Sequence, residues 1–274
     1  MPLPGEFRTI VWHYYRVHGR HGLPWRQTHD PYKVLVSEVM LQQTQVERVI
    51  PFYKKFIKKF PTAKALASAP LADVLKAWQG LGYNRRAKLL RDAARKLPSV
   101  SFSSYRTDLI RLVKDLERLP GVGPYTARAV AAFAYNADVV FVETNIRTAI
   151  IHHFFPNVGH RHRKSNISDR DIGAVLKKAL PKGRAREWYS ALMDYGAHLK
   201  RSGVQVNAKS KHYTKQSKFD GSLRQVRGAI LRALTAGKSL AGVKKEYPDR
   251  FALALAALAH DGMIKKKGRG WAIA

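Results

Sequence analysis

The chain of 274 residues contains no cysteine. Disulfide bonds, thiolate catalysis, zinc–thiolate sites and iron–sulfur clusters held by four cysteines are therefore excluded. Long apolar runs are also missing, because no segment approaches the roughly 18 uninterrupted apolar residues of a membrane-spanning helix. The N-terminus lacks the basic stretch and apolar core of a signal peptide. We expect a cytoplasmic protein without a membrane segment.

Acidic residues are scarce. The sequence has 19 Asp and Glu against 50 Lys and Arg, a formal net charge of +31, and the basic residues are spread along its whole length. Such an excess favours a polyanionic partner. Ribosomal and histone-like proteins share this charge but rarely carry 45% hydrophobic residues over such a length. The alternative is a basic enzyme whose charge serves solubility alone.

Apolar residues recur at helical spacing through the first two hundred positions, and strand-like alternation is scarce. In 31–50 they form one helical stripe with polar gaps. Short breakers, among them Pro51, Pro61 and Pro70, separate the stretches, as in a compact all-α protein with short connections. The other amphipathic stretches lie near 5–18, 51–58, 71–79, 84–97, 106–118, 124–135, 144–154, 171–180 and 185–199.

The C-terminal part has a different organisation. Periodicity is lost in the basic segment 200–220, which we interpret as a loop or linker. Two short apolar runs then flank KKKGRG near the C-terminus, which predicts a β-hairpin. Helices are expected before it, over 222–235, 239–246 and 248–261. This order predicts a winged-helix-like domain over 220–274; the alternative is a helical cap on the main domain.

The segment LERLPGVGPYTARAVAAFA, residues 116–134, predicts two helices joined by a sharp turn. Pro124 suits a first helical position. The backbone N–H groups of Gly121 and Gly123 would then lie beside a helix N-terminus, where the dipole and the unpaired donors favour a phosphate. The alternative is an ordinary helical turn that uses glycine for its geometry. A structural cation at this hairpin also stays open.

A carboxylate interrupts the apolar stripe of 31–50. Glu38 lies among apolar residues, where a solvated carboxylate is unfavourable. It is therefore either a structural residue whose oxygens are hydrogen-bonded or an acid whose pKa is shifted by its surroundings.

These motifs resemble the helix-hairpin-helix (HhH-GPD) base-excision DNA glycosylases, and most of all the mismatch adenine glycosylases. The likeness covers roughly residues 10–200. It implies an all-α, two-lobed glycosylase fold, in which 1–22 and 134–212 form one lobe and 23–133 form the lobe with the hairpin. The likeness rests on LPWR at 23–26, PYKVLVSE at 31–38, SEVMLQQTQV at 37–46, GLGYNRRAK at 80–88, and LPGVG with the following TA.

The resemblance implies roles for two carboxylates. Glu38 would protonate the departing base and then help to position water. The second carboxylate is an Asp in the family pattern VDxN, whereas this chain has Glu143 in VETN, one methylene longer. Asn145 would cap the following helix or hold that carboxylate. Tyr125 stands where lyase members have their Schiff-base lysine, so lyase chemistry is not expected. As a catalytic residue, Tyr125 would lie near the same pocket, where its phenol could hydrogen-bond water, the carboxylate or a phosphate.

The resemblance also implies contacts with DNA. Gln42 and Gln43 would meet the base opposite the lesion, and Tyr83 would fill the gap that a flipped nucleotide leaves. The alternative for each of these residues is a role in core packing or a plain surface position. Further predicted DNA contacts are Arg26, Arg86, Gly121, Gly123 and Asn145.

Most relatives carry four cluster-binding cysteines where this chain has LKRSGVQVNAKSKHYTKQS. We therefore expect no cofactor, and phosphate contacts from the basic residues of 200–218 instead. His152 and His153 are expected to pack rather than to bind a metal.

The expected protein is a monomeric, nucleoid-associated, monofunctional DNA glycosylase. It would act on adenine opposite guanine or 8-oxoguanine in double-stranded DNA with a mismatch or lesion. The alternatives are a thymine or uracil mismatch glycosylase acting opposite guanine, and a non-catalytic structure-specific DNA-binding protein.

Overall fold

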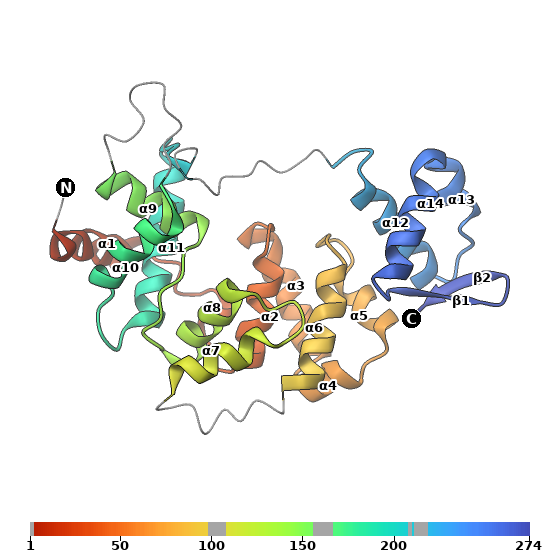
Figure 1. The fold of residues 1–274 in the computed structure, drawn as a ribbon, viewed down its shortest axis with the longest axis horizontal. Coiled ribbons are helices and arrows are strands. Elements are labelled where there is room, and N and C mark those ends of the chain that lie inside the picture. Colours follow the sequence, from red (N-terminus) through yellow and green to blue (C-terminus); the bar gives the residue numbers. More distant parts are fainter. Residues whose placement is uncertain (1–2, 98–107, 156–166, 208–209, 211–218) are drawn as a thin grey trace. The chain divides into compact units, whose positions relative to one another are not determined.

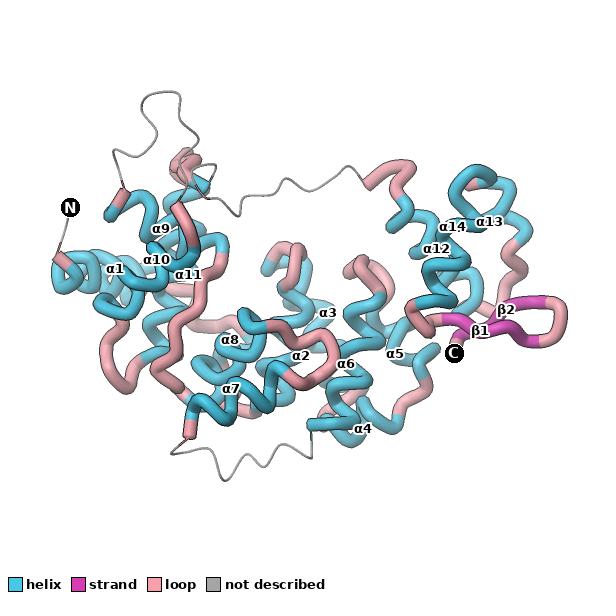
Figure 2. Tube along the Cα trace, viewed as in Figure 1, coloured by secondary structure: helices cyan, strands magenta, loops and turns pink. Residues whose placement is uncertain are grey.

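A computed structural model describes residues 3–97, 108–155, 167–207, 210 and 219–274 (Figures 1 and 2). The described chain is mostly helical, with one C-terminal β-hairpin, which confirms the predicted fold class. None of the described helices has the length and apolarity needed to cross a bilayer. The helices are α1 (Pro4–His18), the 3₁₀ helix η1 (Pro24–Arg26), α2 (Pro31–Leu41), α3 (Val46–Lys59), α4 (Ala63–Ser68), α5 (Leu71–Trp78), α6 (Arg85–Lys96), α7 (Leu109–Glu117), α8 (Pro124–Tyr135), α9 (Thr144–Phe154), α10 (Asp169–Ala179), α11 (Ala185–Arg201), α12 (Leu223–Thr235), α13 (Ala241–Glu246) and α14 (Pro248–His260).

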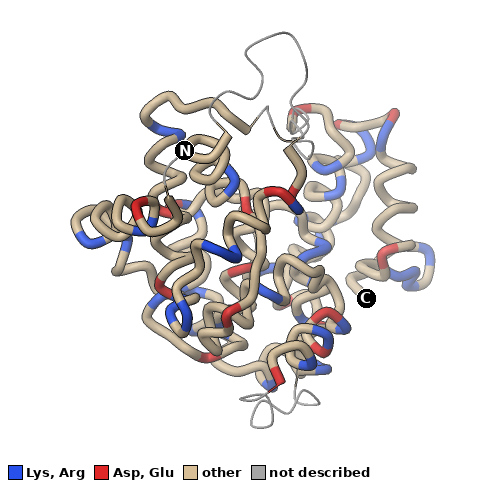
Figure 3. Tube along the Cα trace, turned by 60° about the vertical axis from the view of Figure 1, so that its left-hand side comes forward, with Lys and Arg blue, Asp and Glu red and all other residues tan. Residues whose placement is uncertain are grey.

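The chain divides into two compact units. The first unit contains α1 and α7–α11, and the second contains α3–α6, α12–α14 and the hairpin, while the boundary crosses α2 after Val34. Lysine and arginine are spread over the helices of both units (Figure 3). The lobe boundaries expected from the sequence, 1–22 with 134–212, 23–133 and 220–274, stay a prediction.

The first unit is built around α11, which packs against α9, α8 and α1. Helix α1 places Phe7, Val11 and Tyr15 on one buried face, four residues apart, as a helix requires. The ring of Phe7 meets Phe154 of α9 at 5.1 Å and Trp188 of α11 at 6.0 Å, in edge-to-face contacts. These contacts fix the helices that carry Glu143 and its neighbours.

The second unit has its own core. Helices α4 and α5 pack on α6, and α3 packs on α5. Trp78, at the end of α5, is fully buried and meets Phe56 of α3 edge to face at 5.8 Å. Its indole N–H donates to the carbonyl of Gly82 at 3.1 Å, so the core holds the loop between α5 and α6 directly.

The C-terminal module, residues 219–274, belongs to the second unit and has the predicted order of three helices and a hairpin. Ser222 caps α12 by accepting from the N–H of Gln225. Strands β1 (Ile264–Lys267) and β2 (Gly270–Ile273) pair antiparallel, with Ile264 opposite Ile273. Helix α12 packs on α5, and Gln79 donates to the hydroxyl of Thr235 at 2.8 Å.

Two local predictions were wrong, and one helix was missed. The apolar stripe of 31–50 is not one helix, because the chain turns after Leu41 and Gln43 adopts φ 54°. Pro51 does not separate helices but lies inside α3, where its missing N–H costs one hydrogen bond near the start of the helix. The short helix α4 was not predicted, although Thr62 caps it by accepting from the N–H of Ala65.

Candidate active site and nucleic-acid interface

Glu38 lies on α2 in the second unit. The side chain of Asp30 accepts from the N–H of Tyr32 at 2.9 Å, and Pro31 follows as the first residue, so the start of this helix is encoded locally. Glu38 is 5% exposed, and buried residues precede and follow it in the helix. The acid role of Glu38 stays a prediction.

Arg86 braces the end of α2. Its guanidinium donates to the carbonyls of Val39 at 2.6 Å and Gln42 at 2.7 Å, and to the carbonyl of Gly82 at 3.1 Å. Burial lowers its pKa to about 10, against the opposing effect of Tyr83. A cation at a helix C-terminus is favoured by the unpaired carbonyls there. Arg86 therefore joins the loop after α2 to the loop before α6; its predicted DNA contact stays a prediction.

Those two loops carry the predicted DNA-reading residues. Gln43 has φ 54° and Tyr83 has φ 49°, although side-chain-bearing residues rarely adopt the left-handed region. Gly80 precedes Tyr83 with φ 102°, and a Cβ there would lie 2.7 Å from the ring of Phe52. Backbone strain of this kind clusters at binding sites. It therefore supports the prediction that Gln43 and Tyr83 contact a ligand; the half-buried Gln42 lies beside them.

The two glycines of the predicted hairpin serve different purposes. Gly121 has φ 76°, and a Cβ there would lie 2.8 Å from Cβ of Leu89, so both conformation and space require glycine. Gly123 has an ordinary φ of −89° and caps α8, with Pro124 as its first residue. Nothing lies within 4 Å of a Cβ built on Gly123, so this helix N-terminus is open to an approaching anion. Phosphate binding here stays a prediction.

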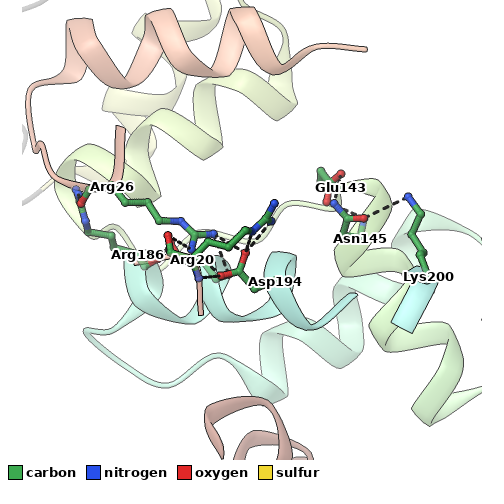
Figure 4. A network of polar contacts seen from close by, with 8 residues as sticks. Arg20, Arg26, Glu143, Asn145, Arg186, Asp194 and Lys200 are labelled. Carbon is green, nitrogen blue, oxygen red and sulfur yellow. Dashed lines mark hydrogen bonds and ion pairs between the residues drawn. The ribbon is translucent and has the colours of Figure 1, made fainter. Parts of the chain in front are cut away.

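Glu143 lies in the first unit and begins α9. Its carboxylate accepts from the backbone N–H of Asn145 at 2.7 Å and from the Asn145 side-chain amide at 3.2 Å (Figure 4). Lys200 of α11 donates to the Asn145 side-chain oxygen at 3.3 Å. Burial raises the pKa of Glu143, although the N–H of Asn145 and the charge of Lys200 oppose the shift. Asn145 thus hydrogen-bonds this carboxylate within the first unit; its predicted DNA contact stays a prediction.

Tyr125 lies in the first turn of α8 and is half-buried. Its ring packs edge to face on Phe141, 5.7 Å between centroids, two residues before Glu143. The phenol therefore belongs to the same region of the first unit as this carboxylate. Its predicted catalytic role stays a prediction.

Arg26 belongs to a buried ionic network around Asp194 of α11. Asp194 is 2% exposed, accepts from Arg26 at 2.7 and 3.0 Å, and accepts from the side chain and the N–H of Arg20 (Figure 4). Arg186 donates to the carbonyls of Arg26 and Thr28. The network ties the segment after α1 to α11. Its bonds occupy the Arg26 guanidinium, whose predicted DNA contact stays a prediction.

Two residues of α11 were not identified from the sequence. Asp194 binds the side chains of Arg20 and Arg26, and Gly196 packs against the main chain of Asn145. Asp194 has no local motif, because its partners lie more than 160 positions away in the sequence. Gly196 left a readable signal, since an isolated glycine inside a helical pattern usually marks close packing.

A metal centre is not formed by the described residues, among which no three His, Cys, Asp or Glu side chains are grouped to hold an ion. His153 contacts the hydroxyl of Tyr195 at 2.8 Å, and burial lowers its pKa to about 4. Part of the predicted phosphate-binding segment 200–218 lies outside the described residues, namely 208, 209 and 211–218.

The sequence of the chain is similar to those of known proteins. The model of the HhH-GPD superfamily of base excision DNA repair proteins matches residues 36–168. An adenine DNA glycosylase of Mycolicibacterium smegmatis is 43% identical over 181 residues, 66% of this chain and 59% of that protein. A thymine/uracil-DNA glycosylase of Methanothermobacter thermautotrophicus is 30% identical over 179 residues, 65% of this chain and 77% of that protein.

A solved structure agrees with these sequence matches. The structure of a thermostable thymine-DNA glycosylase superposes with a TM-score of 0.57 at 26% identity, covering 71% of this chain and 86% of that one. The chain belongs to the HhH-GPD superfamily of base excision DNA repair proteins. It spans between about half and three fifths of the length of the adenine glycosylases that it matches.

Proposed function

We propose that the protein is a monofunctional DNA glycosylase of base-excision repair that hydrolyses the N-glycosidic bond of a mispaired adenine opposite guanine or 8-oxoguanine. The observation that carries the proposal is Glu38, a carboxylate only 5% exposed within SEVMLQQTQV, a segment that closely resembles the corresponding helix of adenine glycosylases. Double-stranded DNA as the partner is further supported by the net charge of +31.

The reaction needs an acid and an anion. Adenine is a poor leaving group until it is protonated, and the sugar becomes cationic as the bond breaks. Glu38 supplies the proton as the general acid of the reaction. Glu143 supplies the negative charge that stabilises the sugar cation, and Asn145 keeps its oxygens in place.

The proposed reaction has no lyase step. A Schiff base needs an amine, and the residue at the position of the family's lysine is Tyr125. The protein releases the base and leaves an intact abasic site.

The second candidate is excision of thymine or uracil opposite guanine. The 30% identical relative is named a thymine/uracil-DNA glycosylase, and the matching solved structure is named a thymine-DNA glycosylase. A third reading, a non-catalytic DNA-binding protein, rests on Glu143, which is one methylene longer than the family's Asp.

Base release from labelled oligonucleotide duplexes separates these candidates. Adenine would be placed opposite guanine or 8-oxoguanine, and thymine or uracil opposite guanine, with enzyme in excess over DNA. Release of adenine alone supports the first proposal, and release of only thymine or uracil supports the second. Binding of every mismatch without release of any base would leave the non-catalytic reading.

A further inference from the structure

A cleft of about 1160 Å³ opens within the second unit, between the loop before α6 and helix α12 of the C-terminal module. Gln42, Gln43 and Tyr83 line one wall, and Arg224, Leu231 and Arg232 line the other. The C-terminal module therefore shares this cleft with the residues predicted to read the opposite base.

The lining of this cleft is strongly positive. It includes six arginines, Arg48, Arg85, Arg86, Arg224, Arg227 and Arg232, and one carboxylate, Asp261. Asp261 is already engaged, by Arg85 at 3.2 Å and by Arg227. The lining that the structure describes thus holds six arginines and one carboxylate, which favours a ligand that carries several phosphates.

Arg224 connects the two walls. Its guanidinium lies 5.0 Å from the centre of the Tyr83 ring and donates to the Tyr83 hydroxyl. The guanidinium also lies 5.9 Å from the centre of the Phe219 ring, and the Phe219 side chain is exposed. Stacked aromatic rings and guanidinium groups are the surfaces on which proteins hold unpaired nucleobases. The cleft thus combines a stacking surface with phosphate-binding charge.

We propose that this cleft binds the nucleotide opposite the excised base, on the complementary strand, with its flanking phosphates. In this proposal Arg224 is a specificity-determining residue contributed by the C-terminal module. The inference rests on the proposed glycosylase function. It adds Arg224 of α12 to Gln42 and Tyr83 as a residue that recognises the base opposite the lesion.

Binding to duplexes that hold a tetrahydrofuran abasic analogue tests the proposal. The analogue would be placed opposite each of the four bases, and dissociation constants would be measured by fluorescence anisotropy at one salt concentration. Wild-type protein should prefer some opposite bases. Arg224→Ala should weaken binding to the preferred duplex by about 10- to 100-fold, the effect of one charge-assisted hydrogen bond, and should erase the preference.

Two matched variants exclude simpler explanations. Lys245→Ala removes one exposed charge of the same module away from the cleft, and should weaken all duplexes slightly and equally. Thr235→Val removes the hydrogen bond from Gln79 that helps to dock α12. The same loss of preference in Thr235→Val as in Arg224→Ala would assign the effect to docking alone and overturn the proposal.

Two further results with Arg224→Ala would contradict the proposal. If Arg224→Ala weakens undamaged duplex as much as the preferred analogue duplex, or keeps the wild-type preference, the proposal is wrong. Because the analogue has no base to release, this readout does not depend on catalysis. Wild-type discrimination without excision of any base would therefore sustain the cleft and reject the glycosylase function.

Discussion

Gly196 of α11 lies against the main chain of Asn145 at the start of α9: a Cβ at position 196 would come 2.5 Å from the Asn145 carbonyl carbon, and closer still to its oxygen. The contact sets the separation of α9 and α11 where Asn145 holds Glu143. We predict that Gly196→Ala destabilises the protein by about 1 to 3 kcal/mol, since a packed backbone must shift. Urea denaturation measures the change.

Gly173→Ala is the matched control for this prediction. Gly173 also lies inside a helix of the first unit, α10, but a Cβ there meets only Cγ1 of Val140 at 3.6 Å, an ordinary contact. The change should stabilise α10 by about 0.5 to 1 kcal/mol, because alanine is the better helix former. Equal effects of both substitutions would show that the contact between residues 196 and 145 carries no strain.

Much of this architecture can be predicted from the sequence, because it depends on local patterns. Helix α1 follows from apolar residues four apart, and α12 from a capping Ser222 followed by an amphipathic stretch. The break after Leu41 could not be predicted, since the residues that follow keep the apolar spacing. The end of the helix is held by the distant Arg86, which donates to the carbonyls of Val39 and Gln42 and which no local pattern identifies.

The Asp194 network should make stability depend on pH. Burial alone would raise the pKa of Asp194, but hydrogen bonds and charges from Arg26 and Arg20 outweigh it and hold the pKa below its usual 3.8. The resulting stabilisation is present above about pH 4 and is lost as the pH falls through the lowered pKa. Asp194→Asn should cost about 3 to 5 kcal/mol at pH 7, because it leaves buried guanidinium charge uncompensated.

Unfolding of wild type and Asp194→Asn by urea at pH 7, 4 and 3 would check this. The difference in the free energy of unfolding between them should shrink as the pH falls below 4. A difference that stays constant down to pH 3 would show that the carboxylate charge does not stabilise the fold.

Glu143→Gln should slow base excision by about 10²- to 10³-fold, since it removes the charge that faces the cationic sugar. Glu143→Asp, which restores the family's residue, should keep most of the activity. Because burial raises the pKa of Glu143, the wild-type rate should rise with pH above the usual 4.5 as the carboxylate ionises. This rise should be missing in Glu143→Gln.

Stability separates a chemical from a structural effect of Glu143→Gln. A carboxyl group with a raised pKa loses folded-state stability as the pH rises through that pKa, so the neutral glutamine should not destabilise the protein at pH 7. A slow variant with an unchanged melting temperature fits the proposed role. A variant that unfolds early would reduce Glu143 to a helix cap.

Tyr125 predicts the fate of the product. Incubation with DNA that contains an abasic site, in the presence of borohydride, should give no covalent protein–DNA complex, because a phenol forms no imine. Alkali should be needed to break the strand after base release. Efficient trapping would mean that one of the lysines elsewhere in the chain acts as the nucleophile.

The site is less predictable than the fold. Local motifs indicate Glu38, Gly121 and Gly123, because their neighbours in the sequence define their surroundings. The ion pairs of Arg26 with Asp194 and the contact of Arg224 with Tyr83 join residues more than 140 positions apart, and no local pattern encodes them. The left-handed backbone of Gln43 and Tyr83 is likewise imposed by the surrounding fold.

The central claim is that Glu38 is the acid that expels the base, and single-turnover excision by Glu38→Gln tests it most directly. Glutamine has the same size but cannot donate the proton, so excision should slow by about 10²- to 10⁴-fold. Affinity for the mismatched duplex should stay near that of the wild type, because Glu38 is buried and carries no phosphate contact in this account. Excision at the wild-type rate by this variant would contradict the claim.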